Sequence, residues 1–545
     1  MNEVLFQGFH YFQESPFRQM NGQRLWVFLA NEANHLRSIG IDAIWIPPAY
    51  RAADANGPGY DVYDHYNVGE FSLNGQVETR YGTKAELQAA ISALHGNSTS
   101  KKIDVYADVV LNHLDGGQPD GYWEAIRVEK EDRTIVRDGE GFERGRIEIK
   151  AWTGFDYPER GGNYSSFKWS SRHFDSVDTV INIRQNGQVF TEANKYIYRY
   201  LFNESGFDPH EKDFERWVDL EKGNYDYLNS CDFDYGRSDV RQEMMNWGAW
   251  YFQQFNFDGI RFDAVKHISR HYIQQWLGHL RWKTGKNLFA VAEYIADNTG
   301  KLHDYIKDVS TKWEFPQRIT LFDFALFFKF KTASWAGEQY DLGVLFNNTL
   351  MSEQPTLAVT FVENHDYEFG RNVDTHVQAW FKPLGYAFIL LRDGGYPCLF
   401  FPDYYGSATV KTHQGYLSGR EYLDLLLQLR KQFGFGQELS YSAGSIAGWV
   451  RLGFVTGARG AMAVVINTAH DQVRSINMHT ARPNKRFYHL ATIKWTPGGY
   501  LVVKQSYLRY GSKASGVWTE ADGSADFPSD GGAVSIWLED GVGLT

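Results

Sequence analysis

Alternating strand and helix patterns run through most of this chain, and they limit its possible folds more than any other feature. Short apolar segments predict buried strands at residues 3–12, 42–48, 103–113, 259–265, 287–295, 319–327, 356–364 and 396–401. Amphipathic segments predict helices at residues 24–40, 84–96, 239–256, 271–285, 380–395 and 419–433. Repeated strand–helix units imply a parallel sheet. About eight such units favour an α/β fold of the closed (β/α)8 TIM-barrel type over an open, doubly wound sheet.

Two regions interrupt the alternation. Residues 114–226 are irregular, polar and rich in glycine, and they follow the third predicted strand. Because a plain loop is rarely this long, we expect an inserted small domain there. From residue 437 onward, short alternating stretches replace the helical patterns and predict a C-terminal antiparallel β-domain. The expected domains are therefore a barrel of residues 1–113 and 227–436, an insertion of residues 114–226, and a β-sandwich of residues 437–545.

The composition argues against several classes of partner. The formal net charge is −11 and the isoelectric point is near 5.9, whereas nucleic-acid binding favours a basic surface. No apolar run approaches the roughly 18 residues that span a bilayer, so no membrane partner is expected. The first residues do not resemble a signal peptide, so we expect a cytoplasmic protein if Met1 is native and a secreted one if a signal was removed. With only two cysteines, Cys231 and Cys398, no disulfide framework is expected. Separately, we expect a monomer.

Charged residues gather where the predicted strands end. Arg261 and Asp263 lie two apart on one strand, so both side chains point to the same face. At the carboxyl end of a barrel strand that face is the inner one, at the mouth where active sites form. Taken alone, such a pair is more often a structural ion pair. Other strand ends, however, carry further carboxylates, two of them beside a histidine: Asp108 with Asn112 and His113, Glu293, and Asp366 with Asn364 and His365.

Several carboxylates at one mouth favour acid–base chemistry, because they repel one another and separate their pKa values. Glycoside hydrolysis needs such a pair: one carboxylate attacks the sugar or activates water, and the other protonates the leaving oxygen. Asp263 and Glu293 end neighbouring strands, at a separation compatible with the roughly 5–5.5 Å of retaining enzymes. Arg261 is expected to keep Asp263 ionised. Glu293, between Ala292 and Tyr294, is expected to have a raised pKa and to act as the acid.

Four short motifs, "DVVLNH", "GIRFDAVKH", "VAEY" and "FVENHD", occur in this order at the strand ends. They resemble the four motifs of the α-amylase family, glycoside hydrolase family 13. The stretches "GIDAIWIPPAY", "GYDVYDHYNVGEF" and "NYDYLNSCDFDYG" resemble bacterial α-amylases of the liquefying and cytoplasmic types. The resemblance implies endo-acting hydrolysis of 1,4-α-glucosidic bonds in starch, glycogen or maltooligosaccharides by a retaining double displacement.

The resemblance also implies roles for individual residues. Asp263 matches the nucleophile, Glu293 the general acid/base, and Asp366 the carboxylate that supports the transition state. The residues that match contacts to the sugar chain are Tyr60, Asp108, His113, Arg261, Lys266, His267 and His365.

A structural calcium ion is implied by the same resemblance. Its ligands are matched by Asn112, Asp226, Asp232 and the backbone carbonyl of His267, and less closely by Asp175 and Asp234. Hard oxygen ligands, six to eight of them, suit Ca²⁺ better than a transition metal. The acidic stretch by itself is more typical of a solvated loop. A metal site becomes the favoured interpretation in a barrel fold, because these ligands would then come from both the insertion and the barrel.

Two positions depart from the family pattern. Ile295 stands where liquefying-type relatives carry tryptophan, which predicts weaker aromatic stacking on the leaving-group side. Gly236 stands where those relatives carry a third aspartate, which puts their additional metal sites in doubt.

Three other functions compete with hydrolysis. A transglycosylase of the same family would share every motif, so only its products would distinguish it. A non-catalytic member kept for binding usually loses a catalytic carboxylate, and this chain keeps all three. An unrelated metal-dependent barrel hydrolase would need paired histidine ligands at strand ends, and an H-x-H pattern is absent.

Overall fold

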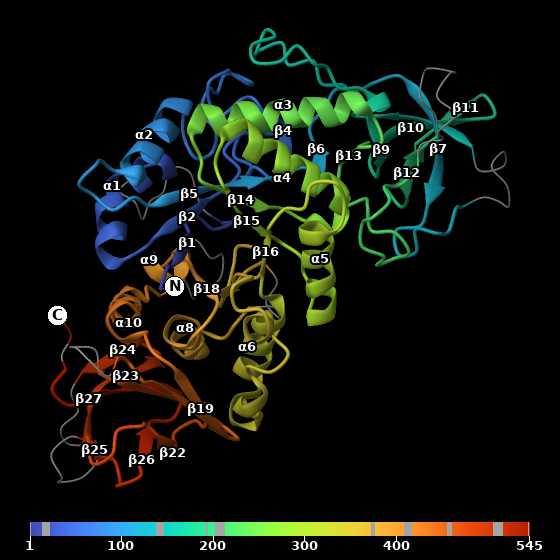
Figure 1. The fold of residues 1–545 in the computed structure, drawn as a ribbon. Helices are drawn as coiled ribbons and strands as arrows, with labels where there is room; N and C mark the ends of the chain where they lie inside the picture. The colour runs from blue at the N-terminus through green and yellow to red at the C-terminus, as the bar shows by residue number, and fades with distance from the viewer. Residues whose placement is uncertain are drawn as a thin grey trace.

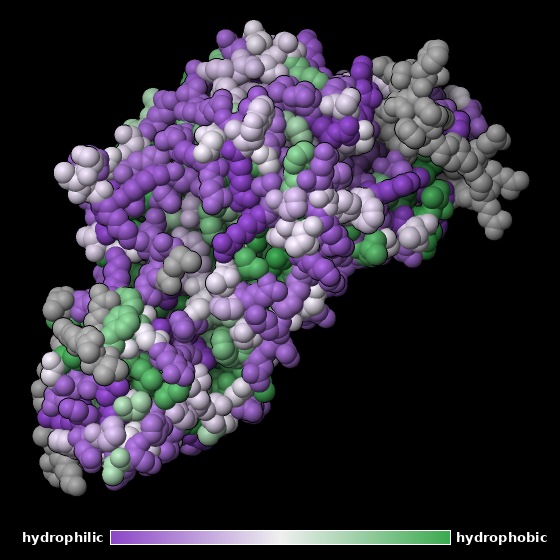
Figure 2. Space-filling view, in the orientation of Figure 1, coloured by the Kyte–Doolittle hydropathy of each residue, from purple (hydrophilic) through white to green (hydrophobic). Residues whose placement is uncertain are grey.

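The computed structural model describes residues 2–12, 22–137, 146–191, 194–201, 213–371, 376–407, 417–454, 460–504, 516–542 and 544. It contains a central barrel, an inserted sheet beyond one end of the barrel, and a C-terminal β-domain on the opposite side (Figure 1). Polar residues cover most of the visible face, with apolar residues scattered among them (Figure 2). Among the described residues, no helix is long and apolar enough to cross a membrane. Both cysteines are buried, free thiols.

Eight parallel strands close into a barrel, as the alternating pattern predicts. In order around the barrel they are β1 (Leu5–Gln7), β2 (Ala43–Ile46), β5 (Asp104–Val109), β14 (Gly259–Phe262), β15 (Phe289–Ala292), β16 (Thr320–Phe322), β17 (Ala358–Phe361) and β18 (Tyr396–Phe400). The last strand, β18, pairs with β1 and completes the ring. Each strand lies within one of the predicted segments. The (β/α)8 prediction is therefore confirmed, and the open sheet is excluded.

The helices include all six that periodicity predicts. These are α1 (Leu25–Ile39), α2 (Lys84–His95), α3 (Ser238–Phe255), α4 (Arg270–Thr284), α8 (Lys382–Leu391) and α10 (Arg420–Phe433). Four more were not predicted: α5 (Thr299–Thr311), α6 (Phe324–Ala336), α7 (Leu350–Glu353) and α9 (Phe401–Tyr405). The predicted strand at residues 319–327 is wrong beyond Phe322. The Asp323 carboxylate accepts a hydrogen bond from the backbone N–H of Leu326 at 3.0 Å, which caps the first turn of α6.

Side chains of β14 alternate across the barrel wall, and this places the charged groups inside. Phe262 points outward, where its ring lies 5.6 Å from that of Trp276 on α4. Arg261 points inward, with its guanidinium 4.9 Å from the ring of Trp45 on β2. The two faces expected from the sequence are therefore the faces observed.

Between β5 and β14 the chain forms a separate antiparallel sheet. Its eight strands, in sheet order, are β11 (Gln188–Phe190), β10 (Val180–Gln185), β8 (Ile147–Ala151), β7 (Tyr122–Val128), β12 (Ile197–Tyr200), β9 (Phe174–Val177), β13 (Cys231–Phe233) and β6 (His113–Leu114). A small ribbon of β3 (Arg51–Ala52) and β4 (Val62–Asp64) precedes it in the chain. In this sheet β6 begins one residue before the predicted insertion of residues 114–226, and β13 lies wholly after it. The domain boundaries stay a prediction.

The C-terminal region is an antiparallel β-domain, as predicted. Its larger sheet contains β19 (Glu438–Ala443), β20 (Ile446–Arg451), β21 (Met462–Asn467), β27 (Ala533–Glu539), β23 (Arg486–Thr496), β24 (Gly499–Lys504) and β25 (Gly516–Trp518). A second sheet pairs β22 (Arg474–His479) with β26 (Ser524–Ser529). The two sheets share a buried cluster, in which the ring of Phe527 lies 5.5 Å from Phe487 and 6.0 Å from Trp537.

Candidate active site

A cleft opens at the mouth of the barrel, between the carboxyl ends of the strands and the insertion, and encloses about 1010 Å³. Eight of the predicted site residues line it: Tyr60, His113, Asp263, Lys266, His267, Glu293, His365 and Asp366. The other two, Asp108 and Arg261, are fully buried and contact these residues from below. The structure therefore brings together every residue that the sequence assigns to catalysis or sugar contact.

Arg261 lies at the centre of the charged groups. Its Nη1 donates to both oxygens of Asp108, at 2.9 and 3.1 Å, and to Oδ1 of Asp263, at 2.6 Å. Its Nη2 donates to Oε2 of Glu293. Burial disfavours the charged form of Arg261, but Asp108 and Glu293 outweigh this effect and raise the pKa of Arg261 above its usual value. One permanent cation thus holds three carboxyl groups from three neighbouring strands.

Asp263 and Glu293 lie side by side. They are the residues that follow β14 and β15, whose last residues are opposite each other in a parallel pair. Burial raises the pKa of Glu293 to about 8; Arg261 lowers this pKa, and the charges of Asp366 and Asp263 raise it. Glu293 therefore carries a proton at neutral pH, which is the state required of a general acid.

Asp108 lies at the buried bottom of the cluster. Its Oδ2 accepts hydrogen bonds from the indole Nε1 of Trp45 at 2.9 Å and from the hydroxyl of Tyr60 at 2.8 Å. Burial raises the pKa of Asp108 to about 7, and Arg261 opposes this rise. Trp45 is not among the residues predicted for the site. Its inward position on β2 is the signal that could have identified it.

Asp366 lies between a histidine and an arginine. Gln7 Nε2 donates to His365 Nδ1 at 3.1 Å, so the ring proton of His365 is on Nε2, which lies 3.4 Å from Oδ2 of Asp366. Burial lowers the pKa of His365 to about 4, so the ring is neutral near pH 7. On the other side, Arg371 Nη2 lies 3.4 Å from Oδ1 of Asp366, and its guanidinium covers the ring of Tyr11 at 3.5 Å. Nothing in the sequence points to Arg371, because its contact depends on the path of the loop after β17.

One wall of the cleft is formed by two rings, the phenol of Tyr60 and the imidazole of His365. The ring of Tyr60 stacks on that of His365, with centroids 5.0 Å apart and planes 7° from parallel. His113 Nε2 donates to the backbone carbonyl of Tyr60 at 2.9 Å, which fixes the position of both residues.

A further side of the cleft is lined by Lys266, His267 and Ile295. Lys266 Nζ donates to Oε1 of Glu221 at 2.6 Å and lies 5.3 Å from the centre of the Tyr294 ring. Ile295 is partly exposed on this side and has no aromatic face to offer a sugar.

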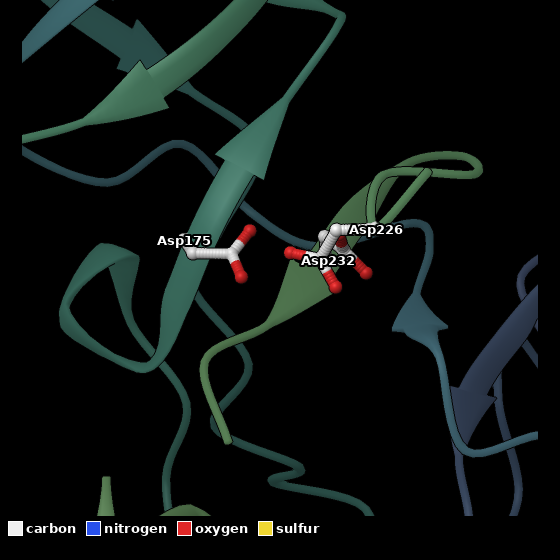
Figure 3. Close-up of side chains that lie close together, drawn as sticks. All are labelled: Asp175, Asp226 and Asp232. Carbon is white, nitrogen blue, oxygen red and sulfur yellow. The ribbon is translucent and has the colours of Figure 1, made fainter. Parts of the chain in front are cut away.

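Three buried carboxylates form a second acidic group, in the insertion. They belong to Asp175 on β9, Asp232 on β13 and Asp226, which precedes β13, and they point toward one another (Figure 3). One oxygen from each lies within 4.8 Å of the other two. Burial raises the pKa of each carboxyl group, and neighbouring carboxylates raise it further. A buried group of this charge requires protons or a cation to neutralise it.

The donor set of this group suits a hard cation. Asn112 Nδ2 donates to Oδ1 of Asp232 at 2.7 Å, which joins the barrel to the insertion. Two oxygens, Oδ1 of Asn112 and Oδ2 of Asp175, are buried and have no hydrogen-bond partner. Unsatisfied oxygens beside carboxylates are the ligands that Ca²⁺ prefers. The residues at hand therefore fit the ion that the sequence predicts.

The remaining predicted ligands lie near this group. Asp234 is outside it but close enough to raise the pKa of Asp175. The ring of His267 lies 4.2 Å from that of Tyr225, which brings His267 next to the segment that carries Asp226. Glu215, which was not predicted, also belongs to these surroundings: its backbone N–H donates to Oδ2 of Asp226 at 2.8 Å. Among the residues described, no other group of three His, Cys, Asp or Glu side chains has its ligand atoms close enough together to hold one metal ion.

A (β/α)8 barrel with two carboxyl groups, those of Asp263 and Glu293, on one guanidinium at its mouth defines an acid–base enzyme of the barrel class. Comparison with known proteins gives the family. Residues 29–138 match the family model "Alpha amylase, catalytic domain". The α-amylase of Geobacillus stearothermophilus is 39% identical over 515 residues, covering 94% of this chain and 84% of that protein. The cytoplasmic α-amylase of Escherichia coli K12 is 34% identical over 551 residues, covering 98% and 99%.

The chain belongs to the α-amylase family and is a glycoside hydrolase. The solved α-amylase of Geobacillus thermoleovorans, complexed with acarbose, has the same fold, with a TM-score of 0.59 at 14% identity, and the match covers 99% of this chain and 98% of that one. The family resemblance of the four motifs is therefore confirmed.

Proposed function

We propose that the chain hydrolyses internal 1,4-α-glucosidic bonds of starch-like glucans with retention of configuration. The observation that carries this proposal is the contact of Asp263 and Glu293 with one guanidinium, that of Arg261. Retaining glycosidases hold their carboxyl groups about 5–5.5 Å apart, whereas inverting ones need about 6.5–9.5 Å to admit water. Two carboxyl groups on neighbouring nitrogens of one guanidinium fit the shorter spacing. The names of the relatives support the substrate class.

The first chemical step uses both carboxyl groups. The Asp263 carboxylate attacks the anomeric carbon and forms an ester, while the bond from that carbon to the glycosidic oxygen breaks. Glu293 gives its proton to the departing oxygen, and its pKa of about 8 keeps that proton available at neutral pH.

The second step restores the enzyme. The Glu293 carboxylate removes a proton from a water molecule, whose oxygen attacks the anomeric carbon and displaces Asp263. Two inversions at one carbon leave the product in the α configuration.

Three other groups position the sugar in this scheme. Asp366 accepts hydrogen bonds from sugar hydroxyls and stabilises the positive charge of the transition state. The neutral His365 ring donates from Nε2 toward the same region. The Tyr60 ring, which His365 supports from behind, offers a flat face on which the sugar stacks. Arg261 and His113 are proposed to position the sugar at the cleavage site, and Lys266 and His267 to contact the sugar chain beyond the cleaved bond.

We propose further that Asp175, Asp226, Asp232 and Asn112 bind a structural calcium ion, with Asp234 and the His267 carbonyl beside them. The ion would neutralise the buried carboxylates and join the insertion to the barrel through Asn112. In this proposal the ion has a structural role, and no step of the reaction involves it.

Early products from amylose test the function. Endo-acting hydrolysis predicts a broad range of maltooligosaccharides at low conversion, whereas exo action predicts one product length. Incubation with maltoheptaose separates hydrolysis from transfer, since a transglycosylase would form longer chains. Products longer than maltoheptaose as the main outcome would contradict the proposal. The relatives' names do not favour that alternative.

A further inference from the structure

Two tryptophans, the exposed Trp217 and the half-buried Trp313, lie against each other outside the cleft. Trp217 comes from the insertion, and 59% of its surface is exposed. Its ring meets that of Trp313, which follows α5, with centroids 5.0 Å apart and planes at 70°. Trp313 stacks in turn on His271 of α4, at 4.9 Å and 18°. We call Trp217, Trp313 and His271 the tryptophan platform.

The backbone holds both tryptophans in an uncommon conformation. Their φ angles are +70° at Trp217 and +67° at Trp313, in the left-handed region that bulky side chains rarely adopt. Such conformations persist only where the surroundings enforce them, and they cluster at ligand-binding positions. Here the backbone N–H of Arg270 donates to the Trp217 carbonyl at 3.2 Å, and Gln274 Nε2 donates to the Lys312 carbonyl at 2.6 Å. The first turns of α4 thus hold the backbone at Trp217 and directly before Trp313.

The platform is connected to the leaving-group side of the cleft but does not line it. The segment that begins at Trp217 continues to Asp219, whose backbone N–H donates to the carbonyl of Lys266 at 2.9 Å. Glu221, at the end of the same segment, accepts from Lys266 Nζ. One short stretch of chain therefore leads from a cleft residue to the platform.

The chemistry of the platform fits a neutral sugar chain. A glucose ring presents C–H groups on its faces and hydroxyls on its edge, so it stacks on a flat indole ring beside polar groups. The neighbours Arg216 and Glu314 are exposed and of opposite charge, which does not select for an anionic or a cationic ligand. We propose that the tryptophan platform is a second α-glucan-binding surface, separate from the catalytic cleft. This proposal rests on the proposed function, because the glucan is the substrate assigned there.

Affinity electrophoresis in gels that contain amylopectin tests the platform. The variants Trp217→Ala and Trp313→Ala are compared in an Asp263→Asn background, where the glucan is not consumed and the cleft contributes equally to all samples. We expect each substitution to weaken retention roughly three- to tenfold, as the loss of one aromatic stacking contact implies. Trp217→Phe keeps an aromatic face and should retain part of the binding. Trp282→Ala, which removes a 73% exposed tryptophan elsewhere on α4, is the matched control and should change nothing.

Activity in the otherwise wild-type enzyme separates the platform from the cleft. Trp217→Ala should lower the rate on amylopectin and leave kcat/KM for maltotriose unchanged. Unchanged retention of both alanine variants, with normal amylopectin hydrolysis by the wild type, would overturn the platform alone. If the wild type hydrolyses no glucan, the proposed function fails instead. Sedimentation experiments test a different role for the platform. If the wild type forms a dimer that Trp217→Ala disrupts, and if this variant retains the glucan normally, the platform binds a second copy of the chain and the proposal is refuted.

Discussion

Replacing Glu293 by Gln should stabilise the folded protein, and the gain should grow with pH. The folded-state pKa of Glu293 is about 8, above the usual value of 4.5, because burial disfavours its charged form. The stability that a group with a raised pKa contributes is fully present below the unfolded pKa and is lost as the pH rises through the folded pKa. With these two pKa values, linkage predicts that ionisation of Glu293 lowers the free energy of unfolding of the wild type by about 1 kcal/mol at pH 5, about 3 kcal/mol at pH 7 and nearly 5 kcal/mol at pH 9.

Gln cannot ionise and still accepts a hydrogen bond from Arg261, so Glu293→Gln should escape this loss. Thermal unfolding followed by tryptophan fluorescence at pH 5, 7 and 9 measures the difference between variant and wild type. A change of 1 kcal/mol moves Tm by about 2–4 °C in a domain of 150–250 residues, so a growth of about 4 kcal/mol between pH 5 and 9 corresponds to a Tm advantage that grows by about 8–16 °C.

Asp258→Asn is a control of opposite sign. Burial acts to raise the pKa of Asp258, but hydrogen bonds from His95 and Lys102 outweigh it and lower that pKa. The stability from Asp258 is therefore present at neutral pH and lost as the pH falls through its folded pKa. Asp258→Asn should lower Tm at pH 7, and the deficit should shrink in acid. A Tm difference between Glu293→Gln and the wild type that is constant from pH 5 to 9 would refute the assignment of a buried, protonated Glu293.

Four further predictions concern catalysis and the metal. Asp263→Asn should fold with an unchanged Tm and release reducing ends several orders of magnitude more slowly than the wild type, because an amide cannot form the ester intermediate; wild-type turnover would contradict its role. Proton NMR should show the α-anomer before mutarotation, and an early β-anomer would exclude retention. The kcat/KM of the wild type should fall above about pH 8, where Glu293 loses its proton, and a flat profile to pH 9 would argue against Glu293 as the acid. Chelation should lower Tm, and added calcium should restore it, because calcium at 100 times its Kd adds roughly 2.7 kcal/mol to the free energy of unfolding. The response should be abolished in Asp232→Ala. An equal Tm with chelator and with calcium, together with no calcium by elemental analysis, would defeat the metal site.

The barrel could be predicted because its strands are covered on both faces. A parallel strand between a packed interior and an outer helix is apolar along its whole length, as in Ala43–Ile46, and such runs are recognisable without other information. The residues of the mouth followed from the same fact, because closure of the barrel brings the carboxyl ends of all strands together. Asp108, Asp263 and Glu293 meet at Arg261 although they are far apart in the sequence.

The residues that were missed depend on contacts that no local pattern records. Asp323 ends a strand and starts a helix because its carboxylate also accepts a hydrogen bond from the backbone N–H of Met351, at 2.7 Å. Glu215 joins the acidic group of the insertion through the fold of that segment against Asp226. Arg371 contacts Asp366, five residues earlier, because the loop after β17 folds in turns, with the backbone N–H of Arg371 donating to the Glu368 carbonyl. The contact of Asp323 with Met351 joins segments that are distant in the sequence, and the contact of Arg371 with Asp366 depends on how one loop folds on itself.

The charges at the mouth explain why one carboxyl group keeps a proton there. Arg261 supplies one positive charge to Asp108, Asp263 and Glu293 together, so full ionisation would leave a net charge of about −2 in a buried site. Such a state is costly in a low dielectric, and the cost falls when a carboxyl group binds a proton. Glu293 is the group with the highest of the raised pKa values, about 8 against about 7 for Asp108, so it holds the proton most firmly. The shortage of positive charge that makes this cluster a poor source of stability thus keeps a proton on the side chain proposed to protonate the glycosidic oxygen.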